Sequence, residues 1–303
     1  VMFSFIIPLS VDIDNQIASN NDSKINNSKT DFEKVLSGES IDDKEKVDEG
    51  LDLSNILEDV FKFDELPEDT VRLSASTIEQ LFKDTNYSLS EVRRTKKVKP
   101  IRLSLLPNEM KSIENSGKRK NLFIKIILPL VLEENNRIII DRKKLFTILN
   151  KNKNSKDEIK WLNQKFKQYG VVNKDLATLK VRMDIIPVSL AIAQAAKETG
   201  WGTSRFAIEG NALFGQWTWS GEGIKPAGAD TNATYKVMKF NVLKASVRAY
   251  QRNLNTHSSY KKFRFIRAQL RDDNKKLDSL KLAEYLDNYA QTGTEYTKVL
   301  KQI

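Results

Sequence analysis

The sequence lacks cysteine altogether and holds a single histidine, His257, among its 303 residues. Without cysteine, neither a disulfide nor a thiolate metal site can form. One imidazole is too few for zinc hydrolase chemistry, which usually uses two or three. We therefore expect neither a metal ion nor an organic cofactor.

Long hydrophobic runs are also missing. Residues 1–9 (VMFSFIIPL) are almost wholly apolar but too few to span a bilayer, and the chain then turns polar at once. We interpret them as the end of a secretory signal or a membrane anchor, although a buried strand is the alternative. The protein is then expected in the cell envelope, either periplasmic or anchored to the inner membrane. The run Leu122–Leu132 contains Lys125 and Pro129 and predicts a buried, kinked helix instead of a membrane span.

Net negative charge is confined to the N-terminal part of the chain, and basic residues outnumber acidic ones in the rest. Residues 31–70 hold fifteen acidic residues and four lysines, yet the whole chain has a formal charge of +10. A basic body favours a polyanionic partner such as nucleic acid, an anionic membrane face or a cell-wall polymer. The basic run Arg93–Lys99 lacks the interleaved aromatic residues of a single-strand binder, so we expect no nucleic-acid partner.

Composition divides the chain into three parts. Residues 10–50 are rich in Asn, Ser, Asp and Lys and have little apolar content to offset the entropy of ordering. Residues 1–50 are therefore predicted to be a truncated signal or anchor followed by a disordered, flexible tether. Residues 51–150 are predicted to be a helical N-terminal region that begins with a short docking helix within 51–66. Residues 151–303 form the third part.

Within the third part, a glycine-rich stretch interrupts a series of predicted helices. The helices Lys156–Tyr169 and Ile186–Thr199 precede it, and Gly200 and Gly202 end the second one. Residues 210–243 contain loops and a small β-lobe, and helical patterns then return up to the C-terminus. We predict a mainly α (α+β) fold, in which a lysozyme-like helical domain carries a small β-lobe with a cleft between them.

Glu198 lies in the last turn of the alanine-rich helix, four residues after Gln194 and therefore near its inward side. The negative end of the helix dipole and burial beside Trp201 would both raise the pKa of Glu198. A general acid needs such a raised pKa to hold its proton near neutral pH. From position alone, however, a solvated glutamate at a helix end is the more frequent outcome.

The segment Ile186–Trp217 (IPVSLAIAQAAKETGWGTSRFAIEGNALFGQW) resembles the signature of the bacterial Bax-like glucosaminidases. This group is a branch of the mannosyl-glycoprotein endo-β-N-acetylglucosaminidase-like domain, related to glycoside hydrolase family 73. The likeness covers roughly residues 120–303, including Ser246–Arg264 and Leu286–Ile303. The resemblance implies a peptidoglycan hydrolase with Glu198 as its catalytic acid.

Further site residues follow by position in the family's motifs. Asn211 and Phe214 match an "NNLFG" loop that lines the cleft, although its first Asn is Gly210 here. Tyr289 and Tyr296 match two C-terminal tyrosines, of which the resemblance implies that Tyr289 faces the glycan and assists at the reaction centre.

A second catalytic group is less clearly marked. Hydrolysis by two carboxylates needs a second acid across the bond, and the β-lobe offers Glu222 and Asp230, neither within a clear motif. A substrate-assisted route, with the N-acetyl group as nucleophile, would need no second acid. The aromatic residues that could stack on sugars are Trp201, Trp217, Trp219 and Tyr235. Core packing is the alternative and is favoured for Trp201, and His257 is expected to brace a helix end.

The leading hypothesis is a monomeric β-N-acetylglucosaminidase that cleaves β-1,4 bonds in peptidoglycan glycan strands. A lytic transglycosylase would use the same acid with an internal sugar hydroxyl as nucleophile. A non-catalytic peptidoglycan-binding module is the third possibility. An amidase, which labels for this domain also suggest, would need a nucleophilic cysteine, a metal cluster or a Ser–His pair, and nothing here supports one.

Overall fold

Most of the chain is described by the computed structural model, namely residues 53–62, 65–66, 70–219, 222–228, 230, 232 and 234–303. The predicted signal or anchor and the tether within 1–50 lie outside the described residues and stay predictions. Of the helices described, none is both long and apolar enough to cross a membrane.

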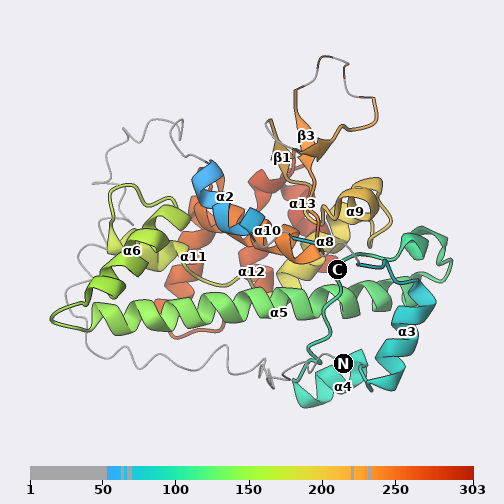
Figure 1. Cartoon of the computed structure of the whole chain (residues 1–303), viewed down its shortest axis with the longest axis horizontal. Coiled ribbons are helices and arrows are strands. Elements are labelled where there is room, and N and C mark those ends of the chain that lie inside the picture. The colour runs from blue at the N-terminus through green and yellow to red at the C-terminus, as the bar shows by residue number, and fades with distance from the viewer. Residues whose placement is uncertain are drawn as a thin grey trace.

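Helices dominate the fold (Figure 1). The α-helices, in chain order, are α2 (Leu53–Lys62), α3 (Ala75–Asp84), α4 (Leu89–Thr95), α5 (Ser116–Leu149), α6 (Lys156–Gln168), α7 (Leu176–Arg182), α8 (Val188–Thr199), α9 (Arg205–Gly210), α10 (Leu243–Thr256), α11 (Lys261–Asp272), α12 (Ser279–Ala283) and α13 (Thr294–Gln302). Three short 3-10 helices are η1 (Asn108–Ser112), η2 (Ser258–Tyr260) and η3 (Asp287–Tyr289).

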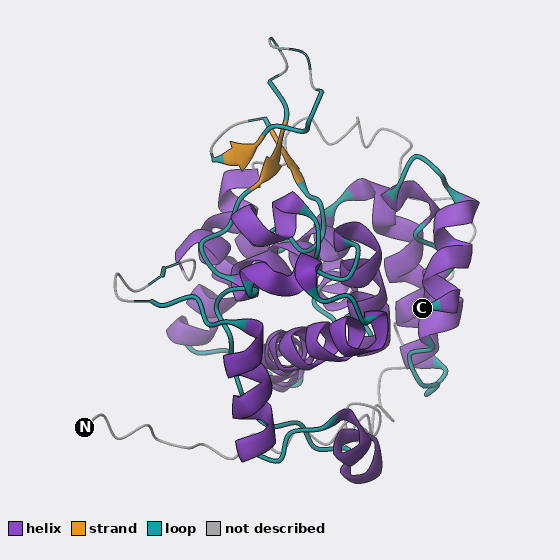
Figure 2. Cartoon of the chain, turned by 90° about the vertical axis from the view of Figure 1, so that its right-hand side faces the viewer, coloured by secondary structure: helices purple, strands orange, loops and turns teal. Residues whose placement is uncertain are grey.

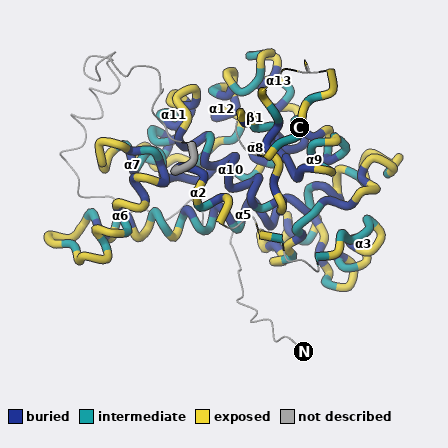
Figure 3. Tube along the Cα trace, turned by 45° about the horizontal axis from the view of Figure 1, so that its top comes forward, coloured by how far each residue is buried: buried dark blue, intermediate teal, exposed yellow. Residues whose placement is uncertain are grey.

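The long helix α5 runs through the molecule and packs against α8 and α10 (Figures 1 and 3). Its segment Leu122–Leu132 is largely buried, so the predicted buried helix is confirmed. Pro129 lies inside the helix and cannot donate a backbone hydrogen bond to the carbonyl of Lys125. The hydroxyl of Tyr87 donates to that carbonyl at 3.2 Å instead, which supplies a partner where the proline removes one.

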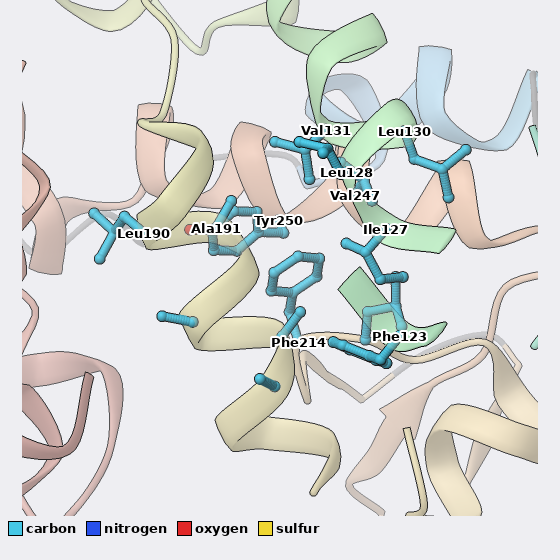
Figure 4. Close-up of a cluster of buried hydrophobic side chains, with 14 of the residues drawn as sticks. Phe123, Ile127, Leu128, Leu130, Val131, Leu190, Ala191, Phe214, Val247 and Tyr250 are labelled. Atoms are coloured by element: carbon cyan, nitrogen blue, oxygen red, sulfur yellow. The ribbon is translucent and has the colours of Figure 1, made fainter. Parts of the chain in front are cut away.

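One apolar core joins elements from distant parts of the sequence. It extends from Ile78 in α3 to Leu300 in α13, and α5 and α8 contribute to its centre. In the close-up of Figure 4, Phe123 and Ile127 of α5 lie near Phe214 and Tyr250. The core therefore crosses residue 150, where composition suggested a division between two parts of the chain.

The alanines of α8 explain how this helix can lie so deep. Ala191, Ala195 and Ala196 are fully buried, and their small side chains let neighbouring backbones approach closely. The boundaries of α6 and α8 agree with the predicted helices to within two residues. At the start of α6, Ser155 and Glu158 form a capping box.

The β-lobe is a small antiparallel sheet of β1 (Trp217–Thr218), β3 (Lys236–Met238) and β2 (Gly223–Ile224), in that order. Val237 at the middle of β3 pairs with Trp217 on one side and Ile224 on the other. Figure 2 shows the strands projecting from one end of the helical body. The predicted fold class, a mainly α body with a small β-lobe, is confirmed.

Candidate active site

The end of α8 is held in one conformation, and this fixes the position of Glu198. Gly200 adopts a left-handed conformation with φ +57°, and the N–H groups of Gly200 and Trp201 both donate to the carbonyl of Ala196. The hydroxyl of Thr199, which is fully buried, accepts a hydrogen bond from the N–H of Gly202 at 2.8 Å. Hydrogen bonds to the residues before and after Glu198, Ala196 and Thr199, therefore fix the last turn of α8.

The turn after α8 is pressed against α5. A Cβ added at Gly202 would lie only 2.9 Å from the ring of Phe123, and Gly202 has a φ of +81°. Trp201 packs edge-on against the same ring, with centroids 6.0 Å apart, and Lys120 lies over the indole. Trp201 is thus directed towards α5 and packs against the core, as favoured from the sequence, and its expected shelter of Glu198 stays a prediction.

Four tyrosines lie within electrostatic reach of the carboxyl group of Glu198, and Tyr296 also forms a hydrogen bond with it. The charge of Glu198 acts on all four, each from a different element, and helps to raise their pKa values: Tyr250 of α10, Tyr260 of η2, Tyr289 of η3 and Tyr296 of α13. For Tyr260, burial and the charge of Glu198 raise the pKa to about 12, against the opposing effect of a hydrogen bond with Asn253. Hence the phenols stay protonated and can act as hydrogen-bond donors over the whole physiological range.

Burial raises the pKa of Glu198 above the ordinary value for a glutamate. Hydrogen bonding from Tyr296 and the charge of Lys197 oppose this shift without cancelling it. The side chain is only partly exposed to solvent. Glu198 therefore combines access from outside with a preference for its protonated form, as a general acid requires.

A buried hydrogen-bond chain leads from α10 to Tyr296. The hydroxyl of Tyr250 donates to Oε1 of Gln194 at 2.6 Å, and Nε2 of Gln194 donates to the hydroxyl of Tyr296 at 3.1 Å. Gln194, Tyr250 and Tyr296 are all buried. Because the oxygen of Tyr296 accepts from Gln194, its own O–H is left to donate towards Glu198.

Residues 211–215 form the loop that approaches the carboxyl group. Nδ2 of Asn211 donates to the carbonyls of Phe240 and Asn241, both at 3.0 Å. The ring of Phe214 stacks on Tyr250, with centroids 3.8 Å apart. Both side chains are buried, so they shape the loop, and it is the backbone at Gly215 that faces Glu198.

Tyr289 binds this same loop. Its hydroxyl donates to the carbonyl of Phe214 at 2.8 Å, and its ring stacks on Tyr296 with centroids 5.5 Å apart. The side chain is partly exposed. In this arrangement Tyr289 positions the loop next to Glu198, and its predicted assistance to the reaction stays untested.

Comparison with known proteins relates this site to a family. Residues 173–303 match the glucosaminidase family described as mannosyl-glycoprotein endo-β-N-acetylglucosaminidase. Protein bax of Escherichia coli (strain K12) is 34% identical over 206 residues, which cover 65% of this chain and 72% of that protein. The chain belongs to the Bax-like glucosaminidases. No solved structure matches it.

Glucosaminidase-family membership gives the chain a glycan-hydrolase type of role, and the matched range contains Glu198, its loop, the β-lobe and the four tyrosines. Helix α5, against which α8 packs, precedes that range. The region that matches the family, residues 173–303, is therefore packed against a helix that lies before that region in the sequence.

The two candidate second acids lie on the β-lobe, and both are exposed. Asp230 accepts a hydrogen bond from the N–H of Asn232, and the backbone carbonyl of Glu222 accepts one from Lys239. Within the described structure, the groups that shift the pKa of Glu198 are Tyr296 and Lys197, and neither carboxylate is among them. The choice of a second acid stays a prediction.

Three of the predicted sugar-binding aromatics form an exposed surface on the β-lobe. Trp217, Trp219 and Tyr235 are 49%, 68% and 38% exposed, although aromatic rings are usually buried. Trp217 and Tyr235 pack edge to face at 5.3 Å. Flat apolar rings held at the surface suit contact with a pyranose, and this binding role is a prediction.

The remaining expectations concern metal sites, His257 and the cleft. Among the residues described, no group of three or more His, Cys, Asp or Glu side chains could hold a metal ion. His257 caps the end of α10 and its Nδ1 accepts from the N–H of Ser259, as predicted for a helix-bracing role. A small pocket lies beside α5 between Pro129 and Val98, and none of the residues around Glu198 lines it. The groove predicted beside Glu198 stays a prediction.

Of the residues around Glu198, sequence reasoning missed Tyr250, Tyr260 and the hydrogen-bonding role of Gln194. Gln194 did carry a signal, because it precedes Glu198 by four residues and shares its helix face. Tyr260 carried none, since it follows α10 in a turn whose position depends on the fold.

Proposed function

We propose that this chain is a β-N-acetylglucosaminidase that hydrolyses β-1,4 bonds of peptidoglycan, with Glu198 as general acid. One observation carries the proposal. Glu198 lies at the fixed end of α8, partly open to solvent, with a pKa raised by burial and with Tyr296 as hydrogen-bond partner. Family membership supports the same type of reaction.

In the proposed reaction, Glu198 gives its proton to the glycosidic oxygen as the bond to the anomeric carbon breaks. Positive charge develops at that carbon, and Glu198 becomes a carboxylate. The hydroxyl of Tyr296 and the ammonium group of Lys197 both favour this charged form, because each lowers the pKa of Glu198. They therefore stabilise the product state of proton transfer, whereas burial keeps the proton in place beforehand.

The nucleophile has two sources in this proposal. A carboxylate on the β-lobe, Glu222 or Asp230, can activate water on the opposite face of the sugar. Alternatively, the oxygen of the substrate's N-acetyl group attacks the anomeric carbon and water later opens the resulting ring. Glu222→Gln and Asp230→Asn separate these routes, because full activity in both variants supports the substrate-assisted one.

The decisive experiment compares wild type, Glu198→Gln and a control on peptidoglycan zymograms, with mass spectrometry of the released muropeptides. Glu209→Gln is a suitable control, since Glu209 is exposed on the next helix, α9. We expect wild type and control to release fragments with N-acetylglucosamine at the reducing end. Glu198→Gln should lose at least about 100-fold in rate, as is typical for removal of a general acid. Full activity in Glu198→Gln would refute the assignment.

A lytic transglycosylase is the second candidate, favoured by one observation. Among the residues that the structure describes, the groups that shift the pKa of Glu198 are a tyrosine and a lysine, with no second carboxylate among them. An internal sugar hydroxyl as nucleophile needs no such acid nearby. The same muropeptide spectra decide, because this reaction leaves 1,6-anhydro-muramyl ends. Peptidoglycan that is bound without any release of fragments indicates a non-catalytic binding module.

The proposal also places the chain in the cell envelope, as a monomer acting on glycan strands. The formal charge of +10 supports attraction to an anionic wall polymer, and the exposed rings on the β-lobe support contact with its sugars. Pull-down with purified cell walls, set beside filter binding to DNA at physiological salt, tests the partner class.

A further inference from the structure

Helix α2 lies far from Glu198 in sequence. It packs against residues 238–242, the segment that holds the loop 211–215 beside Glu198. Its apolar side consists of Ile56, Leu57 and Val60, all buried. They share one core cluster with Met238, Phe240 and Val242 and with Ala245 and Ala249 of α10. Figure 1 shows α2 lying on α10. The segment 238–242, which joins β3 to α10, is thus backed by α2.

The same segment is tied to the loop that faces Glu198. The N–H of Met238 donates to the carbonyl of Gln216 at 2.8 Å, and the N–H of Phe240 donates to the carbonyl of Gly210 at 2.9 Å. The carbonyl of Phe240 accepts from the side chain of Asn211. Hydrogen bonds therefore join both ends of the loop 211–215 to residues 238–240, and α2 packs on that segment.

Asp59 anchors α2 in this position by charge. Its Oδ2 lies 3.1 Å from Arg252 of α10 and 3.2 Å from Arg137 of α5, and it accepts a hydrogen bond from Gln168 at 2.5 Å. The backbone carbonyl of Asp59 accepts from Arg248 at 3.2 Å. Arg252 is nearly fully buried, and Asp59 is the carboxylate with which it forms an ion pair. Loss of this partner would leave a buried charge uncompensated.

We propose that α2 is a positioning segment for the active site, which through Asp59 and its apolar face holds residues 238–242 and hence the loop beside Glu198. The contacts that carry this inference are independent of the reaction, and only its activity readout rests on the proposed function. Asp59 is a positioning residue, because it anchors α2, whose apolar side packs on Phe240, and Phe240 in turn binds Asn211 of the loop.

The test uses Asp59→Asn in the full chain, with Glu58→Gln as matched control on the exposed side of α2, where Glu58 pairs with Lys62. Amide hydrogen exchange is followed peptide by peptide. We expect exchange at least about tenfold faster in 211–216 and 238–242 in Asp59→Asn, with α13 and residues 116–128 of α5 unchanged. Glu58→Gln should leave all of these rates as in wild type. Wall-lytic activity should fall with the loop's protection.

Val60→Ala provides a milder second variant, because it weakens the apolar contact and leaves every charge in place. It should accelerate exchange in the same two segments by a smaller factor. Faster exchange confined to α2 in both variants would overturn the proposal and make α2 a peripheral appendage. An even loss of protection across α5, α8 and α13 would also overturn it, since α2 would then support the whole core. If Asp59→Asn loosens the loop as expected while Glu198→Gln remains fully active, the proposed function fails and the positioning role stands.

Discussion

The carboxyl group of Glu198 lies against the backbone of Gly215, so close that a Cβ added to Gly215 would be 3.4 Å from Oε2. Gly215 also has a φ of +60°, which side-chain-bearing residues adopt only at a cost. The positive φ favours glycine at this position, and the same residue is the point where the loop meets the carboxyl group. A methyl group here would already touch Oε2.

Gly215→Ala tests this approach. The added methyl group would touch Oε2 of Glu198 and would strain the left-handed backbone, so we expect the loop to shift and the rate of wall lysis to fall by about tenfold, since misplacement by 1 Å can cost as much as 100-fold. The left-handed conformation should also cost about 1–2 kcal/mol of stability. Gly228→Ala is the matched control, because Gly228 has a φ of +77° and nothing within 4 Å of an added Cβ. Equal rates in the two variants would show that the approach to Glu198 has no role.

Glu198→Gln should stabilise the protein while it removes activity. The pKa of Glu198 is raised in the folded state, so the folded protein binds this proton more tightly than the unfolded chain does. The ionised carboxyl therefore costs stability once the pH rises above its unfolded value of 4.5, and neutral glutamine avoids that cost. We expect a higher Tm for the variant at pH 7 and a difference that shrinks towards pH 4. A lower Tm at pH 7 would contradict the raised pKa.

Local patterns in the sequence predicted the elements that carry the site, but not the contacts between them. The alanine-rich stretch with a glycine after it predicted α8 and placed Glu198 at its end. Partners from distant segments left no such local trace, since Gln194 and Tyr296 are 102 positions apart and Asp59 and Arg252 are 193 apart. Family resemblance supplied the importance of Tyr296, and only the fold shows Gln194 beside it.

Trp201 illustrates how little a local argument says about the direction of a side chain. Its position three residues after Glu198 suggested that it would shelter the acid. The chain takes left-handed conformations at Gly200, Trp201 and Gly202, which turn the backbone back towards α5. Positive φ at a tryptophan is uncommon, and sequence patterns gave no signal of it. The indole consequently packs on Phe123.

Acid should destabilise the protein through Asp184, which is buried among arginines. Burial alone would raise the pKa of Asp184, but Arg142, Arg271 and Arg267 hold it well below its ordinary value of 3.8. Stability from a lowered pKa is fully present above the unfolded pKa and is lost progressively as the pH falls from there towards the lower pKa of the folded state. We therefore expect the free energy of unfolding, measured with urea, to decline from about pH 5 towards pH 3. Asp184→Asn should lose about 3–5 kcal/mol at pH 7 and show a flatter decline.

Trp219→Ala tests the aromatic surface of the β-lobe. Because Trp219 is 68% exposed, its truncation should leave the Tm nearly unchanged. If the ring stacks on sugars, binding to insoluble peptidoglycan should weaken by roughly 0.5–1.5 kcal/mol, the range of aromatic contacts, or about two- to tenfold in Kd. Val172→Ala is the control, as Val172 is an exposed apolar residue on the helical body, away from the lobe. Unchanged retention in Trp219→Ala would remove this residue from the binding surface.

Tyr289→Phe separates two roles for this tyrosine, because it removes the hydroxyl and keeps the ring that stacks on Tyr296. If the hydroxyl only holds the loop, the carbonyl of Phe214 loses its partner, and stability should fall by about 1 kcal/mol together with a partial loss of activity. If the hydroxyl instead acts on the sugar, kcat should collapse while the Tm stays near that of wild type. We expect the first result, since the hydrogen bond to Phe214, at 2.8 Å, already engages the only proton that this hydroxyl can donate.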